Sequence, residues 1–234
     1  MLSGVGGRLV AIGGLSPDVD DTALHRFVRS TAGRARPRVC YVPAASGDFD
    51  RYVELFYEQY PRSECEPTHL ELLRGVPRAP AAVVAEQDVV YIGGGSTPIL
   101  VAALRIHGLD AVLRELWEAG GVVCGDSAGA HVWFEGCITD SLGPDLQAFP
   151  DGLGFVAGSC VAHLDEGRTE LAAAALLGGG LPGPIWGIPD GAALVFEGTN
   201  VAEAVTSREA GVVVQLERTN GTVSSRNIAA RRLP

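Results

Sequence analysis

One stretch of the chain has the residue types of a nucleophile elbow. An apolar run beginning at Val122 leads into Gly125-Asp126-Ser127-Ala128-Gly129, and a helix-compatible segment follows at residues 131–134. At such a turn the strained backbone requires small neighbours and lifts the serine hydroxyl above the end of a sheet. An ordinary strand–turn–helix junction with a serine N-cap has the same pattern. The pentapeptide therefore indicates a nucleophile only if the chain also supplies a base, an acid and an oxyanion hole.

The base of a serine nucleophile is usually a histidine within hydrogen-bond reach. His163 follows a small, apolar run at residues 155–162 that is typical of a strand, and it precedes a segment, residues 164–168, that we expect to be a loop. His131 lies one helical turn after the serine and would have to bend back over the elbow. It also forms an i, i+4 pair with Glu135, but no third metal ligand follows at a telling spacing. We expect His163 to be the base and no metal to be bound; the other histidines are upstream on predicted helices or a weak strand (His25, His69 and His107).

The acid that would orient the histidine is less clearly marked, because several aspartates follow the serine. Asp165 is too close in sequence to His163 to pair with its ring. Asp190 follows an apolar segment at residues 185–189 and lies in a Pro-Asp-Gly turn, which is a strand-end position but also a routine turn. Spacing favours Asp190 over Asp140 by a modest margin, and both stay open on this evidence.

Two glycine-rich strand ends offer backbone donors for an oxyanion. The amide of Ala128 follows the nucleophile at a helix start and is the natural first donor. The second would come from the triple glycine at residues 93–95. A glycine run can instead cradle a phosphate, but the Walker A spacing is absent and the run does not match GxGxxG. In parallel α/β sheets such strand ends open onto one crevice.

The elements that must position these residues alternate along the chain. Strands are predicted at residues 8–14, 39–43, 68–73, 88–95 and 155–162. Helices are predicted at residues 20–32, 52–60, 80–86, 97–107 and 109–119. No composition break marks a linker, so we expect one α/β domain over residues 1–234, with a doubly wound, mainly parallel sheet and helices on both faces. Short strands after residue 185, with a hairpin signal at Thr219-Asn220-Gly221, predict antiparallel strands added near the C-terminus.

Composition excludes several classes of protein. A hydrophobic fraction of 47% with 20% charged residues allows a sizeable core. The net charge of −10 argues against nucleic-acid binding, which needs clustered Lys and Arg. Five widely spaced cysteines without a CxxC pair suit a reducing compartment. The first residues show neither a signal peptide nor a membrane span, so we expect a cytoplasmic protein that does not bind membranes.

Taken together, these features resemble the peptidase E (aspartyl dipeptidase) and cyanophycinase-like serine peptidases, on a fold akin to class I glutamine amidotransferases. The resemblance covers about residues 8 to 200 and rests on four motifs in the family's order: residues 91–95, residues 125–130, the strand end at His163, and residues 188–191. It implies a triad of Ser127, His163 and Asp190, unlike the serine–acid–histidine order of α/β-hydrolases. Peptidase E has a glutamate at the last position, so this chain has the shorter acid.

The resemblance also implies a serine exopeptidase that hydrolyses short peptides, above all dipeptides with N-terminal aspartate, through an acyl-enzyme on Ser127. It implies oxyanion donors at Gly95 and Ala128. Ser96 replaces an asparagine of peptidase E, and Arg168 is the available cation after the histidine, so both are candidates for substrate binding. No metal or organic cofactor is expected, the partner is a small peptide, and a homodimer stays open.

Two alternatives to the dipeptidase remain at this point. A cyanophycinase-like hydrolase of β-aspartyl peptides would want a wide anionic cleft, with which the net acidity is compatible. A catalytically silent binding protein on the same fold is the other alternative. A complete set of triad residues argues against it, since loss of activity usually leaves at least one member replaced.

Overall fold

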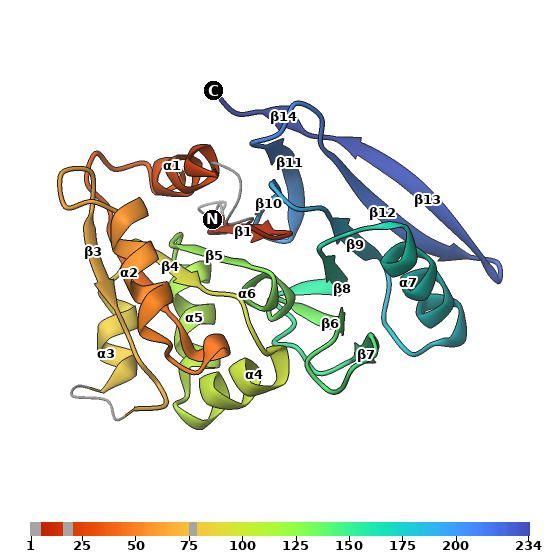
Figure 1. Cartoon of the computed structure of the whole chain (residues 1–234), viewed down its shortest axis with the longest axis horizontal. Helices are drawn as coiled ribbons and strands as arrows, with labels where there is room; N and C mark the ends of the chain where they lie inside the picture. The colour runs from red at the N-terminus through yellow and green to blue at the C-terminus, as the bar shows by residue number, and fades with distance from the viewer. Residues whose placement is uncertain (1–5, 16–20, 75–78) are drawn as a thin grey trace, which may run out of the picture.

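The computed structural model describes residues 6–15, 21–74 and 79–234, which form two sheets with helices packed against them (Figure 1). Residues 1–5, the beginning of the segment searched for a leader, and Asp20, the predicted start of the first helix, lie outside the described residues. In spatial order, the strands of the eight-stranded sheet are β14 (Arg231–Arg232), β11 (Asn200–Thr206), β10 (Ala192–Glu197), β1 (Arg8–Ile12), β5 (Val122–Asp126), β4 (Val89–Ile92), β2 (Arg38–Val42) and β3 (Glu66–His69).

The five strands from β1 to β3 in this sheet all run parallel. The central residues of β1, β5, β4 and β2 are apolar and buried, as in strands that are covered on both faces, whereas the edge strand β3 is largely polar. β10 joins the other edge of β1 in the antiparallel direction, and β11 continues the sheet beyond it. The expectation of a mainly parallel α/β sheet with antiparallel strands from the C-terminal part of the chain is confirmed.

Side chains alternate between two apolar layers, as the period of a strand requires. On β1, Leu9 and Ala11 face one layer, and Val10 and Ile12 face the other. The first layer is closed by α3 (Pro80–Ala85), α4 (Thr97–Ile106) and α5 (Leu109–Glu118). The second is closed by α1 (Thr22–Thr31) and α2 (Asp50–Gln59). The helices therefore lie on both faces of the large sheet.

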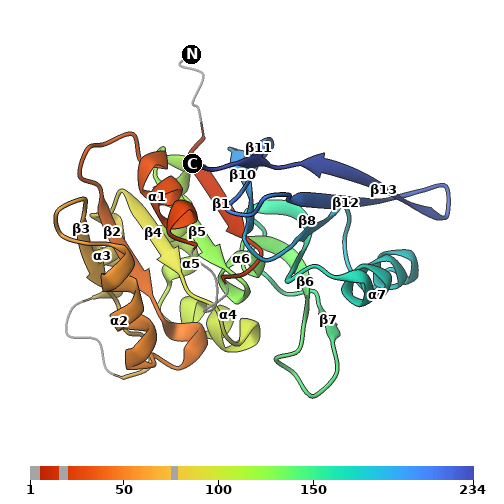
Figure 2. The same cartoon turned by 45° about the horizontal axis from the view of Figure 1, so that its top comes forward.

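A second sheet of six strands follows the elbow in the chain. In spatial order its strands are β13 (Thr222–Ala229), β12 (Val212–Thr219), β9 (Ile185–Ile188), β8 (Val156–Ala162), β6 (Phe134–Thr139) and β7 (Gln147–Phe149). β8 is parallel to both β6 and β9, and β12 and β13 form the predicted hairpin. Helix α7 (Glu166–Gly178) packs on this sheet, and the hairpin extends past it in Figure 2.

Two local predictions were wrong. The helix after the elbow, α6, covers only Ala128–His131, and Phe134 already begins β6. Burial decides this, since Trp133 and Phe134 are fully buried and pack edgewise or tilted against Phe155 and Phe196. Residues 166–168, expected in a loop, are the first turn of α7, because the Asp165 carboxylate caps that helix by accepting the Arg168 amide at 2.7 Å.

The five cysteines are buried and carry free thiols. Burial raises the pKa of the Cys40 and Cys137 thiols to about 12, so both stay protonated and unreactive. In the described part of the chain, no helix is both long and apolar enough to cross a membrane.

Candidate active site

The structure brings Ser127, His163 and Asp190 into one hydrogen-bonded chain. His163 Nε2 lies 2.9 Å from Ser127 Oγ, and His163 Nδ1 lies 2.6 Å from Asp190 Oδ1. A carboxylate can only accept, so Nδ1 carries the proton and Nε2 is left to accept from the serine hydroxyl. Asp140, the alternative acid, does not contact the ring; its Oδ2 lies 3.7 Å from the guanidinium of Arg168. The arrangement can move a proton from the serine hydroxyl to the imidazole.

Ser127 lies at the sharp turn between β5 and α6. Its backbone has φ 52° and ψ −115°, a conformation that L residues rarely adopt. Small neighbours make the turn possible: a Cβ on Gly125 would lie 2.4 Å from the carbonyl oxygen of Gly129, and a Cβ on Gly129 would lie 2.0 Å from that of Ile92. The elbow therefore requires both glycines of the pentapeptide.

His163 and Asp190 come from neighbouring parallel strands of the second sheet. Ala162, at the end of β8, pairs with Ile188, at the end of β9, so the next residues leave the sheet side by side. His163 has φ 52°, and Gly191, after the aspartate, has φ 72°. These turns aim both side chains toward the elbow of the first sheet.

Three successive carbonyls at the end of β1 hold the three parts of the site in place relative to one another. Each accepts the amide of one triad residue or of the residue that follows it. The pairs are Ile12 O with Ser127 N–H at 3.1 Å, Gly13 O with His163 N–H at 3.0 Å, and Gly14 O with Gly191 N–H at 2.9 Å. We call residues 12–14 the clasp. Sequence reasoning missed this role, although the two glycines at the end of the first strand were its signal.

The clasp packs directly against the acid–base pair. A Cβ on Gly14 would lie 2.2 Å from Asp190 Oδ1 and 2.4 Å from His163 Cε1. A Cβ on Gly13 would lie 2.2 Å from the carbonyl oxygen of Ile188. Only residues without side chains fit between the two sheets at this point.

The two predicted oxyanion donors lie at the ends of β4 and β5. Ala128 begins α6, and the first amides of a helix have no acceptor within it. Gly95 has φ 139°, and a Cβ there would lie 2.2 Å from the carbonyl oxygen of Ala45. Ser96 follows as the residue before α4, and its amide donates to that same carbonyl at 2.8 Å. The triple glycine is thus tied back to the turn after β2.

Arg168 and Asp140 form an ion pair, with 3.7 Å between the guanidinium and Asp140 Oδ2. The guanidinium side chain is 16% exposed, whereas the Asp140 side chain is 68% exposed. The charge of Arg168 reaches the interior, where it helps to lower the pKa of His131. Arg168 is therefore a mostly buried cation, and its partner Asp140 is exposed enough to rotate into solvent.

His131 is a buried structural residue. Its Nε2 accepts the amide of Ala162 at 3.0 Å, so its Nδ1 donates to Thr97 Oγ1 at 3.1 Å. Burial, followed by the charges of His163 and Arg168, lowers its pKa to about 3, so the ring is neutral. Glu135 turns elsewhere and accepts the amide of Gly158. The described residues hold no cluster of three or more side chains suited to a metal ion.

A carboxylate beside the nucleophile was not singled out by sequence reasoning. Asp126 is half-buried, and its Oδ1 accepts the hydroxyl of Tyr91 at 2.8 Å. Burial raises its pKa to about 6, and the Tyr91 hydrogen bond, the His163 charge and the Gly94 amide act in the opposite direction. Its place directly before the serine in the pentapeptide was the available signal.

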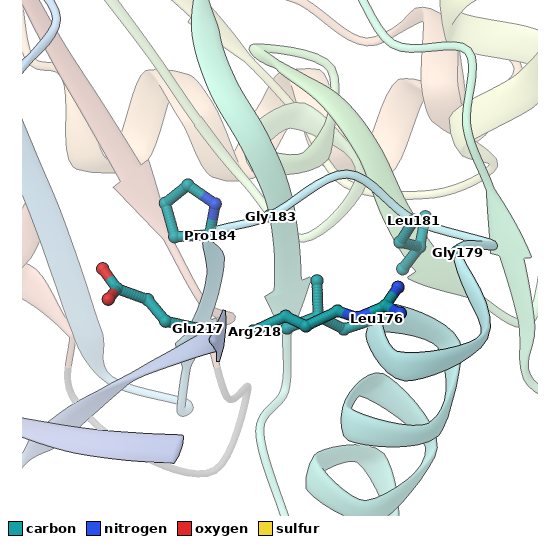
Figure 3. Close-up of a pocket in the computed structure, with 7 residues that line it drawn as sticks. All are labelled: Leu176, Gly179, Leu181, Gly183, Pro184, Glu217 and Arg218. Carbon is teal, nitrogen blue, oxygen red and sulfur yellow. The ribbon is translucent and has the colours of Figure 1, made fainter. Parts of the chain in front are cut away.

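A separate surface pocket of about 410 Å³ lies between the end of α7, the segment leading into β9, and β12. Figure 3 shows Arg218 extending beside Leu176, while Glu217 points the other way toward Pro184. None of the lining residues belongs to the triad, the clasp or the oxyanion turns. The pocket offers apolar walls and two charged residues, without a nucleophile.

The α/β fold and the family match identify this protein as a peptidase. The chain belongs to Peptidase family S51, whose model matches residues 9–204. It is 38% identical over 197 residues to the uncharacterized peptidase YgaJ of Bacillus subtilis, covering 84% of this chain and 85% of that protein. It is 29% identical over 186 residues to peptidase E of Haemophilus influenzae, covering 73% and 80%.

Solved structures of similar proteins have the same fold. A peptidase from an acI-B1 Actinobacterium matches with a TM-score of 0.71 at 22% identity, over 97% of this chain and 96% of that one. A putative peptidase E from Listeria monocytogenes EGD-e matches with a TM-score of 0.63 at 17% identity, over 86% and 98%. The family resemblance expected from the four motifs is confirmed.

Proposed function

We propose that this chain is a serine exopeptidase that removes N-terminal aspartate from short peptides, above all dipeptides, through an acyl-enzyme on Ser127. The observation that carries the proposal is the hydrogen-bonded chain from Ser127 Oγ through the His163 ring to Asp190 Oδ1. Membership of Peptidase family S51 supports the reaction class. The similarity to peptidase E of Haemophilus influenzae supports the choice of substrate.

In the proposed reaction, His163 Nε2 takes the hydroxyl proton as Ser127 Oγ attacks the peptide carbonyl. Asp190 keeps the Nδ1–H tautomer and stabilises the imidazolium that forms. The imidazolium then gives its proton to the leaving amine, and the acyl-enzyme remains. Water, deprotonated by the same ring, attacks the ester and releases the amino acid and the serine.

The amides of Gly95 and Ala128 would stabilise the negative oxygen of the tetrahedral intermediate. Both are fixed before substrate arrives: Gly95 by its contact with the Ala45 carbonyl, Ala128 by the elbow. Prearranged donors of this kind contribute on the order of 10²- to 10³-fold each to turnover.

Arg168 would bind the side-chain carboxylate of the substrate aspartate. Its guanidinium is mostly buried and bears an ion pair with the exposed Asp140, which a substrate carboxylate can replace. Exchange costs little, because an ion pair with one exposed partner is worth roughly 0–1 kcal/mol. Ser96, between the oxyanion turn and α4, would contact the same substrate.

The free cysteines support a cytoplasmic location for this enzyme, since a reducing compartment keeps thiols from pairing.

The test is a release assay on three peptides: Asp-Leu, its neutral isostere Asn-Leu, and β-aspartyl-leucine. The wild type should hydrolyse Asp-Leu fastest, and Ser127→Ala should hydrolyse none of the three. If the wild type leaves all three intact, the exopeptidase proposal fails. If Ser127→Ala keeps its activity, the serine has no part in the reaction, and a preference for β-aspartyl-leucine would favour the cyanophycinase-like alternative.

A further inference from the structure

We propose that Asp126 binds the N-terminal ammonium group of the peptide substrate and so restricts the enzyme to free amino termini. The inference rests on the proposed function and adds a specificity-determining residue to it. It starts from the side chains that crowd Gly94. An ideal Cβ on Gly94 would lie 2.8 Å from Asp126 Oδ2 and 3.2 Å from Ser127 Cβ. The Asp126 carboxylate and the nucleophile therefore lie side by side against the backbone of Gly94.

Asp126 and Ser127 are both half-buried, so each residue is partly exposed to solvent. A peptide whose carbonyl lies at Ser127 would therefore lie beside the Asp126 carboxylate.

The reaction requires an ammonium group at this place. In a peptide whose first bond is cleaved, the amino nitrogen is two bonds from the carbonyl carbon that the serine attacks. The group that binds it must therefore lie beside the nucleophile. A carboxylate is the natural acceptor, since hydrogen bonds between ammonium and carboxylate are among the strong ones. Asp190 is occupied with Nδ1 of His163, on the side of the ring away from Ser127.

Within the described part of the chain, the Asp126 carboxylate forms no ion pair. Tyr91 donates its hydroxyl to Asp126 Oδ1 at 2.8 Å and so fixes the carboxylate. The titratable groups that face it are Tyr91 from β4, Tyr41 from β2, Tyr60 directly after α2, Cys124 from β5 and His163 after β8. Of these, only His163 can carry a positive charge, and it must be neutral to accept the serine proton. A bound ammonium would supply the missing charge.

Two other roles for Asp126 predict different results. A residue that only anchors the oxyanion turn through Gly94, or only stabilises the His163 imidazolium, would affect all substrates equally. An ammonium anchor instead discriminates between a free and a blocked amino terminus.

The experiment measures binding to Ser127→Ala, which cannot form the acyl-enzyme, by titration calorimetry at pH 8. The two probes are Asp-Leu and N-acetyl-Asp-Leu. Ser127→Ala should prefer the free amine by about 10- to 100-fold, the value of one hydrogen bond between charged groups. The double variant Ser127→Ala/Asp126→Asn should lose most of this preference. An equal preference in both proteins would overturn the proposal.

A second variant covers the case in which Asp126→Asn does not fold. Tyr91→Phe removes a hydrogen bond that lowers the pKa of Asp126, and leaves the carboxylate in place. As the pH is lowered, Asp126 takes up a proton and the preference for the free amine is lost. In Ser127→Ala/Tyr91→Phe the pKa of Asp126 is higher, so this loss should occur at a higher pH than in Ser127→Ala. An unchanged pH dependence in this variant would count against the anchor.

The two proposals can fail separately. If the wild type hydrolyses no peptide and Ser127→Ala binds none, the exopeptidase proposal fails. If the wild type hydrolyses Asp-Leu, but Asp126→Asn rejects N-acetyl-Asp-Leu as strongly as the wild type does, only the role of Asp126 is lost.

Discussion

Gly14 and Asp190 leave no room between them: a Cβ on the glycine would lie 2.2 Å from the carboxylate oxygen that accepts the His163 ring proton. The backbone of the first sheet thus forms one wall of the acid–base pair of the second sheet. Catalytic geometry depends on a residue that has no functional group.

Gly14→Ala should displace the pair and reduce kcat. The added methyl group pushes Asp190 or the His163 ring away, and misplacement by about 1 Å costs on the order of 100-fold. Steady-state hydrolysis of Asp-Leu measures the change. Gly178→Ala is the matched control, because a Cβ there has no neighbour within 4 Å. Equal kcat values in the two variants would contradict the packing argument.

Asp190→Asn should reduce kcat by about 10³- to 10⁴-fold, the scale known for the equivalent change in a chymotrypsin-type triad. The amide cannot hold the Nδ1–H tautomer or stabilise the imidazolium. Asp140→Asn should leave kcat nearly unchanged, because Asp140 contacts Arg168 and not the ring. The same assay compares both variants, and the reverse order of effects would transfer the acid's role to Asp140.

Arg168→Gln should raise KM for Asp-Leu at least about tenfold and leave KM for Asn-Leu unchanged. The guanidinium is the proposed partner of the substrate carboxylate, and a hydrogen bond between charged groups is worth about 1.5–3 kcal/mol. Asp140→Asn, by contrast, should lower KM for Asp-Leu slightly, because it removes the competing carboxylate. An equal rise in KM for Asp-Leu and Asn-Leu would show that Arg168 does not recognise the aspartate side chain.

His131 should make the protein lose stability in acid. Burial lowers the pKa of its ring from 6.5 to about 3, so the unfolded chain binds the proton more tightly than the folded one. The contribution to stability is complete above about pH 6.5 and is lost as the pH falls toward about 3, by up to about 1.4 kcal/mol per pH unit. Urea unfolding at several pH values measures it. His131→Gln should flatten this acid slope, and identical slopes would refute the assignment.

Ionisation of Asp126 should make the protein less stable as the pH rises, which is the opposite of the pH dependence expected from His131. Burial raises its pKa from 3.8 to about 6, so the folded chain binds this proton more tightly and stability falls as the pH rises between these values. Asp126→Asn should therefore be more stable than the wild type at pH 8, by on the order of 2 kcal/mol, with the difference vanishing near pH 4. Urea unfolding of both proteins at the two pH values decides this. A variant that is less stable at pH 8 would show that the charged form is not strained.

Most of the parallel strands of both sheets and the residues at their carboxyl ends could be predicted from sequence, because buried parallel strands have continuous apolar runs. Ser127 follows such a run in the large sheet, His163 and Asp190 follow such runs in the second sheet, and the structure brings their side chains together. The prediction of a helix at residues 131–134 was wrong because burial outweighs the short-range pattern there. Trp133 and Phe134 pack into the core between the sheets.

The division into two sheets and the role of the clasp could not be read from the sequence. Which strands pair depends on contacts between distant residues, such as Gly13 with His163, that leave no periodic signal. Asp126 was overlooked for another reason. In a pentapeptide defined by its glycines and serine, the variable position carries no expected role, and only the geometry around Gly94 gave it one.

In the proposed mechanism, activity depends on how the two sheets pack against each other at the clasp. The proposed nucleophile belongs to one sheet and the proposed base and acid to the other, and the carbonyls of residues 12–14 join them by accepting three amides. A fluctuation that separates the sheets at this seam would disconnect two of the three groups at once. The serine left behind would be an ordinary alcohol, so a molecule opened at this seam would be inactive even though every residue of the proposed triad is present.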